Sequence, residues 1–175
     1  MVAWMQSRGY GTRLVCMVPR DDHALAREHL ASEDQRYPAI VLCVPPETLG
    51  DYLSACDIAV FPRHRHTMNT VVNSSKLQDY MAAGLPVLTT GAHADYIDHL
   101  QSSGTGIVIP ETLRWPDELD GAIRALIQSG ADPAWRAAAA DGFRRCTADQ
   151  SAVLEAYSQA LGRLFAGRDR AQVDG

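Results

Sequence analysis

Five apolar runs of strand length, with segments of helical pattern after them, constrain the fold of this chain more than any other feature. The runs are "RLVCMVP" (Arg13–Pro19), "AIVLCV" (Ala39–Val44), "DIAVFP" (Asp57–Pro62), "LPVLTT" (Leu85–Thr90) and "GIVIP" (Gly106–Pro110). Strands that are apolar throughout and alternate with helices are typical of a parallel sheet covered on both faces. The sequence therefore predicts an α/β fold with a parallel sheet and helices on both sides.

Acidic residues and prolines mark the starts of the helices that connect and follow these runs. After Pro110 the pattern is helical only, as at "WPDELDGAIRALIQSG" (residues 115–130). Apart from the helix between the third and fourth runs, the other predicted helices cover residues 21–32, 45–56, 132–146 and 151–167. We expect a single domain over residues 1–167 that ends in a run of helices, and a frayed polar tail over residues 168–175.

Composition narrows the class of protein. The chain has 175 residues, 46% of them hydrophobic, which suits one domain with a real core. Its net charge is −5 and its basic residues are scattered, which argues against a nucleic-acid or membrane surface. The start lacks the pattern of a signal peptide, and no run reaches the roughly 18 apolar residues of a transmembrane helix. We expect a cytoplasmic protein.

The cysteines lack the short paired spacings of zinc sites. Three of the four lie in apolar or strand-like surroundings, and buried free thiols are the expected state. They are Cys16, Cys43, Cys56 and Cys146.

A short amphipathic segment, "NSSKLQDYMAAGLPVLTT", follows the third run and leads into the fourth. Leu77, Tyr80 and Met81 fall on one helical face, and Gly84 is the predicted C-terminal stop. The N-cap is expected at Asn73, Ser74 or Ser75. In open parallel sheets, ligands bind beyond the carboxyl ends of the strands, where such helices begin.

This helix start has the chemistry of a phosphate site. Its free N–H groups and partial positive charge favour an anion, and Lys76 adds a full charge. Asp79, one turn on, could accept hydrogen bonds from two ribose hydroxyls. Together these residues would suit a nucleotide diphosphate. The alternative is an ordinary serine cap followed by a Lys76–Asp79 pair on a solvated face.

Three stretches, "YLSACDIAVFP", "SKLQDYMAAGLPVLTT" and "GTGIVIP", together resemble a known family. In this order and at these spacings they look like the C-terminal, donor-binding half of retaining glycosyltransferases of the GT-B fold, the group 1 or GT4 family. The similarity extends over roughly Ser7 to Phe165. It implies a Rossmann-like domain that binds a nucleotide-diphosphate sugar (UDP-, GDP- or another NDP-sugar) and needs no further cofactor.

The resemblance also assigns residues. The acid that holds the ribose in the family falls on Asp79, and the helix N-terminus that receives the diphosphate and sugar falls on Asn73, Ser74, Ser75 and Lys76. A glutamate that contacts the donor sugar in many members is replaced here by Val71. No catalytic residue is identified.

A larger departure lies at the front of the chain. The family's opening strand, with its Gly-Arg loop and Lys-Gly, has no counterpart before Trp4, so the edge of "RLVCMV" is expected to be unpaired. The acceptor-binding domain of the family also has no counterpart. The resemblance therefore implies a donor domain whose acceptor half is missing or is a separate polypeptide partner.

Residues beside the third and fourth runs are further candidates. Arg63 and Arg65, in "RHRH", could replace the basic clasp, and His64 with His66 offers two metal ligands without an evident third, so no metal is predicted. Beyond the fourth run, Gly91 and His93 could line the site as phosphate or sugar contacts (sequence "GAHADYIDHL").

Two competing functions remain. One is a degenerate, non-catalytic domain that acts as an interaction or regulatory module. The other is a different doubly wound nucleotide protein, although no G-x-G-x-x-G follows a predicted strand, which disfavours a dinucleotide-binding domain.

Overall fold

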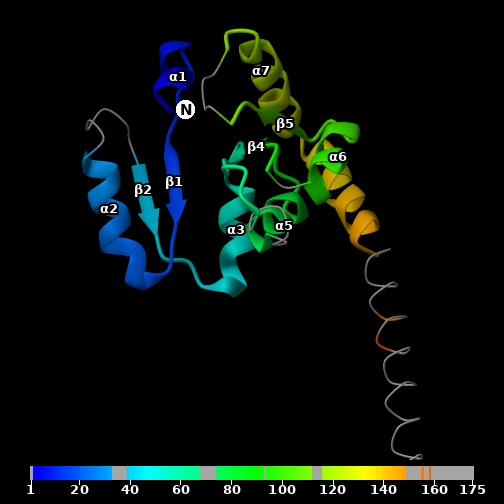
Figure 1. Ribbon diagram of the computed structural model, residues 1–175, viewed down its shortest axis with the longest axis horizontal. Coiled ribbons are helices and arrows are strands. Elements are labelled where there is room, and N and C mark those ends of the chain that lie inside the picture. The colour runs from blue at the N-terminus through cyan, green and yellow to red at the C-terminus, as the bar shows by residue number, and fades with distance from the viewer. Residues whose placement is uncertain are drawn as a thin grey trace, which may run out of the picture.

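The computed structural model describes residues 2–32, 39–67, 74–92, 94–111, 116–148, 155 and 158 (Figure 1). Each of the five predicted apolar runs contains a strand. The strands are β1 (Leu14–Met17), β2 (Ala39–Leu42), β3 (Ala59–Phe61), β4 (Val87–Thr90) and β5 (Gly106–Ile109). The predicted strand order along the chain is therefore confirmed.

Helices occupy the predicted connections. The helices after β1 are α2 (His23–Ser32), α3 (Leu49–Ser54), α5 (Ser75–Ala82), α6 (Ala94–Ser102), α7 (Leu119–Gly130) and a helix over residues 133–148. A further helix that was not predicted, α1 (Val2–Ser7), precedes β1. Short 3-10 turns, Arg20–Asp22 and Pro46–Thr48, precede α2 and α3. In the predicted helix 151–167 only residues 155 and 158 are described, both helical, and the predicted tail 168–175 lies outside the described residues.

All strand pairs are parallel, as predicted, but the five strands form two sheets instead of one. β1 pairs with β2, and β3, β4 and β5 pair in that order. Figure 1 shows the two-stranded sheet with α2 apart from the three-stranded sheet with α5, α6 and α7. The expected unpaired edge of β1 is present among the described strands, because β1 pairs only with β2.

One face of the three-stranded sheet is a row of aliphatic side chains. Val60, Leu88 and Ile107 lie in register across β3, β4 and β5. Met5 of α1 and Ile123 of α7 pack on this row, with Leu88 and Ile123 fully buried. Because successive side chains of a strand point to opposite faces of the sheet, this aliphatic row forms one face, and α1 and α7 cover it.

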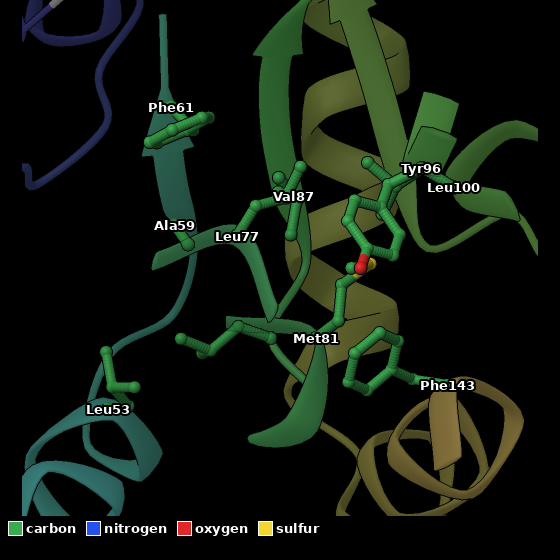
Figure 2. Close-up of a cluster of buried hydrophobic side chains, with 10 residues drawn as sticks. Leu53, Ala59, Phe61, Leu77, Met81, Val87, Tyr96, Leu100 and Phe143 are labelled. Atoms are coloured by element: carbon green, nitrogen blue, oxygen red, sulfur yellow. The ribbon is translucent and has the colours of Figure 1, made fainter. Parts of the chain in front are cut away.

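The opposite face forms the larger core. Figure 2 shows its side chains, which come from α3, β3, α5, β4, α6 and the helix over residues 133–148. Leu77 and Met81 of α5 and Leu100 of α6 are buried there against Val87 of β4. Because helices cover both faces, the predicted α/β architecture is confirmed.

The end of α5 is a Schellman motif. Leu85 N–H donates to the Tyr80 carbonyl and Gly84 N–H to the Met81 carbonyl, both at 3.0 Å. Gly84 has a φ of 66°, in the left-handed region that glycine tolerates. This confirms Gly84 as the stop and turns the chain directly into β4.

The expectation of buried thiols is wrong. Cys43 is exposed and the other three cysteines are half-buried, and all four are free thiols. Cys16 and Cys43 belong to the two-stranded sheet and its exit, where β1 is half-buried and β2 is half-buried or exposed. That sheet lacks the two-sided cover that a buried thiol needs.

Candidate functional site

The start of α5 lies at the carboxyl edge of the three-stranded sheet. β3, α5 and β4 form a β–α–β unit with parallel strands, so the helix must run back from the carboxyl end of β3 to the amino end of β4. Ligands of open parallel sheets bind at this edge. The predicted site residues on α5 are therefore in the expected place.

The first turn of α5 lacks a side-chain cap. Ser74 occupies the N-cap position, half-buried, and its hydroxyl makes no capping hydrogen bond. Ser75 and Lys76 follow and are exposed. The first N–H groups of a helix have no partner within the helix, so this turn presents free amides beside a lysine.

Asp79 lies one turn further along α5 and is half-buried. The alternative Lys76–Asp79 ion pair does not form, since none of the ion pairs among the described residues joins them. No hydrogen bond between described residues involves the Asp79 side chain. Both charges are thus available to a ligand on the part of the helix that begins at the sheet edge.

Tyr80 fixes the side of α5 that faces β3. Its ring meets the ring of Phe61 edge-on, with centroids 6.4 Å apart. Burial raises the pKa of the Tyr80 hydroxyl, and the nearby charges of Asp79, Cys16 and Cys56 raise it further. The tyrosine therefore stays neutral and packs α5 beside β3.

A hydrogen bond joins α5 to α6. The Gln78 side-chain amide donates to the Tyr96 hydroxyl at 2.7 Å. Tyr96 is buried and its ring packs edge-on against Phe143, 6.1 Å between centroids. The helix that carries the candidate site is thus held from two sides.

Two threonines at the end of β4 hold the chain that leaves β3. Thr89 Oγ1 donates to the Phe61 carbonyl oxygen at 2.9 Å. Thr90 Oγ1 accepts from the Arg63 N–H at 2.8 Å and also donates to the Arg63 carbonyl oxygen. Both threonines are buried. The segment with Arg63 and Arg65 is therefore fastened to the carboxyl edge.

Arg65 pairs with Glu111, which follows β5, the far strand of the three-stranded sheet. Its Nε lies 3.3 Å from Glu111 Oε1, and its backbone N–H donates to Glu111 Oε2 at 3.4 Å. The side chains are 72% and 38% exposed, so the pair contributes about 0–1 kcal/mol. Its main consequence is that Arg65 already has a carboxylate partner.

Arg63 is directed elsewhere. Its guanidinium carbon lies 5.0 Å from the centroid of the Phe61 ring, a cation–π contact. The residue is exposed. Among the described residues, no carboxylate pairs with this guanidinium.

Gly91 comes directly after Thr90 and is half-buried. A Cβ added there would meet only Val108 Cγ1, at 3.9 Å, which is ordinary contact. The fold therefore leaves room for a side chain at this position, and a need for glycine would have to come from a ligand.

Three residues that the sequence singled out lie outside the described residues: Asn73, His93 and Val71. His64 and His66 are exposed in the segment after β3. Within the part of the chain that the structure describes, no group of three or more His, Cys, Asp or Glu side chains is placed to hold a metal ion.

The sequence reading missed Thr89, Thr90 and Glu111. A signal was available for the threonines, because they end a run that is otherwise apolar, at the same edge as Arg63. Parallel strands bring their carboxyl ends together, so two hydroxyls there could have been matched to the loop after β3. Glu111 gives no such signal, since it follows Pro110 without a pattern.

A family model described as "Glycosyl transferases group 1" matches residues 6–129 of the 175. No curated protein and no solved structure matches the chain. Among the described helices, none is long and apolar enough to cross a membrane.

Proposed function

The chain belongs to the group 1 glycosyl transferases, and from that premise we propose that it binds the nucleotide-diphosphate sugar whose glycosyl group is transferred. The diphosphate would meet the first turn of α5, at Asn73, Ser74, Ser75 and Lys76, and Asp79 would hold the ribose hydroxyls. The observation that carries the proposal is that the first turn of α5 and the charged side chains of this helix have no partners among the described residues. Its first turn has no side-chain cap, and neither Lys76 nor Asp79 has an ionic partner among the described residues.

Such an arrangement suits the chemistry of glycosyl transfer. When the glycosidic bond breaks, negative charge builds up on the leaving diphosphate, and fixed donors that face this charge lower the barrier. The amides and partial positive charge of the helix start, with the ammonium of Lys76, are donors of this kind. Asp79 would position the nucleoside so that the diphosphate meets them.

The wider architecture supports a finer assignment to the donor half of a retaining GT-B enzyme. Its parallel strands with helices on both faces fit such a half. A GT-B active site is closed by an acceptor-binding domain, so we propose that transfer needs a separate or additional acceptor domain. This chain by itself would bind donor more readily than it turns it over.

The second candidate is a non-catalytic module of the same fold. It is favoured by one sequence observation, Val71 at the position where many family members have a sugar-contacting glutamate. The two candidates differ in ligand binding, because a scaffold has no reason to retain an open phosphate turn.

Isothermal titration calorimetry of the chain with UDP, GDP and their sugar conjugates tests the proposal. We expect saturable binding to at least one nucleotide, weakened about tenfold or more in Asp79→Asn, because hydrogen bonds to a charged group contribute roughly 1.5–3 kcal/mol. The matched control is Asp51→Asn, at an exposed acid of α3. Absence of binding to every nucleotide would support the scaffold instead, whereas equal binding by both variants would overturn the role of Asp79.

A further inference from the structure

We propose that Arg63, and not Arg65, supplies a second cationic contact to the donor diphosphate, in addition to Lys76. The inference rests on the proposed function, since it adds one residue to the same site. Sequence alone does not separate these two arginines, which lie two positions apart in one segment.

The backbone of Arg63 is fixed independently of its side chain. Thr90 Oγ1 bonds both the N–H and the carbonyl oxygen of Arg63. Thr90 is 1% exposed and belongs to the fully buried strand β4. The guanidinium therefore extends from a fixed point at the carboxyl edge, and the contacts that create this point use no side-chain atom of Arg63.

The guanidinium is directed toward the layer that contains α5. Phe61 belongs to the core face shared with Leu77 and Met81 of α5, and its ring also meets Tyr80 (Figure 2 shows Phe61 at the end of β3). Arg63 lies over this same ring at 5.0 Å. Tyr80 and Lys76 are four residues apart on α5 and so lie on one side of the helix. Phe61 thus links Arg63 to the side of α5 that presents Lys76.

The two arginines differ in whether a carboxylate is paired with the guanidinium. Arg65 is already paired with the carboxylate of Glu111, just beyond the end of β5. Arg63 has only an aromatic ring beneath it among the described residues. A cation stacked on a ring keeps its edge N–H groups free, and a planar guanidinium can donate two parallel bonds to phosphate oxygens. Of the two arginines, Arg63 is the one that has a fixed backbone and no carboxylate partner among the described residues.

Calorimetric titration with UDP and GDP as probes separates the two arginines. Arg63→Gln should raise the Kd by about tenfold, the effect of losing one charge-assisted contact. Arg63→Lys should recover part of the affinity, because the charge stays while the paired donors are lost. The charge-matched control is Arg145→Gln, at an exposed arginine of the helix over residues 133–148, and its Kd should stay within about twofold of wild type.

The fold of these variants can be checked separately. Arg63→Gln keeps both backbone bonds to Thr90 and loses only an exposed cation–π contact, so its Tm should fall by less than about 3 °C. A lower affinity with this small change in Tm supports a ligand contact.

The outcomes distinguish this inference from the function on which it rests. If wild type binds and Asp79→Asn weakens binding, while Arg63→Gln binds like Arg145→Gln, then the donor site stands and the Arg63 contact is overturned. If Arg65→Gln weakens binding more than Arg63→Gln, the assignment between the arginines is also overturned. If wild type binds neither probe, the proposed function and this inference fail together.

Discussion

Thr90 and Arg63 are joined by two hydrogen bonds through one hydroxyl. Thr90 Oγ1 accepts from the Arg63 N–H at 2.8 Å and donates to the Arg63 carbonyl oxygen. These bonds connect the end of a buried strand to the segment that leaves the neighbouring strand. The position of the segment with Arg63 and Arg65 therefore depends on Thr90, which touches no ligand in the proposal.

Thr90→Val should destabilise the attachment of the Arg63 segment to β4. The substitution replaces the hydroxyl by a methyl group of similar size and leaves both backbone groups of Arg63 without this partner. We expect the unfolding free energy to fall by about 1–2 kcal/mol in urea denaturation. Thr48→Val, at an exposed residue whose hydroxyl bonds only the nearby Pro45 carbonyl, should change it by less than about 0.5 kcal/mol. Equal stabilities of the two variants would contradict a stabilising role of the Thr90–Arg63 hydrogen bonds.

Gly84→Ala should destabilise the junction between α5 and β4. An added Cβ would lie 2.2 Å from the Arg136 carbonyl oxygen, and the φ of 66° adds strain. We expect a loss of about 2–4 kcal/mol in unfolding free energy. Gly121→Ala is the control, because that glycine lies in α7 with nothing within 4 Å and should gain about 0.5–1 kcal/mol. Thermal denaturation of both proteins checks the opposite signs.

Arg136→Lys should weaken the contacts of the helix over residues 133–148 with the end of α7 and with the turn before β3. The Arg136 guanidinium donates to the carbonyl oxygens of Ser54 and Cys56, each at 2.8 Å, and to that of Gly130. Lysine cannot make this fork, so we expect a loss of about 1.5–3 kcal/mol in unfolding free energy.

Arg144→Lys is the matched control for that change. Among the described residues Arg144 forms one ion pair, with Asp141 on an exposed helix face, where such pairs contribute about 0.5 kcal/mol or less. If chemical denaturation shows equal losses for the two lysine variants, the Arg136 fork does not stabilise the fold.

Tyr80 should make stability fall at alkaline pH. Burial raises the pKa of its hydroxyl in the folded chain, so the unfolded chain loses the proton first. The contribution is complete below the unfolded pKa of about 10 and is lost as the pH rises through the folded value. Tyr80→Phe should reduce the alkaline decline in unfolding free energy, measured by denaturant titration at several pH values. Tyr52→Phe, at an exposed ring, is the control, and equal slopes for both variants would count against this role.

Much of the fold could be predicted because strands and helices leave local patterns. The run "LPVLTT" predicts β4, and Gly84 predicts the end of α5, since only glycine readily adopts the required backbone conformation. The division into two sheets could not be predicted in this way. It depends on whether β1 and β3 pair, a contact between strands that are far apart in the chain and that no local pattern encodes.

The candidate site was predictable in its location and only partly in its contacts. Lys76 and Asp79 follow from helix geometry and the resemblance. The Arg65–Glu111 pair and the stacking of Arg63 on Phe61 depend on which rotamers the tertiary structure permits. For that reason the same role was predicted from the sequence for both arginines, although their side chains have different partners in the structure.

The central claim is that the donor diphosphate binds at the first turn of α5. Amide hydrogen exchange, measured by mass spectrometry with and without the nucleotide that binds best among UDP, GDP and their sugar conjugates, tests it most directly. We predict slower exchange in peptides that cover residues 62–67 and 74–79, with no change in α2. Saturable binding that slows exchange elsewhere and leaves the start of α5 unchanged would contradict the account.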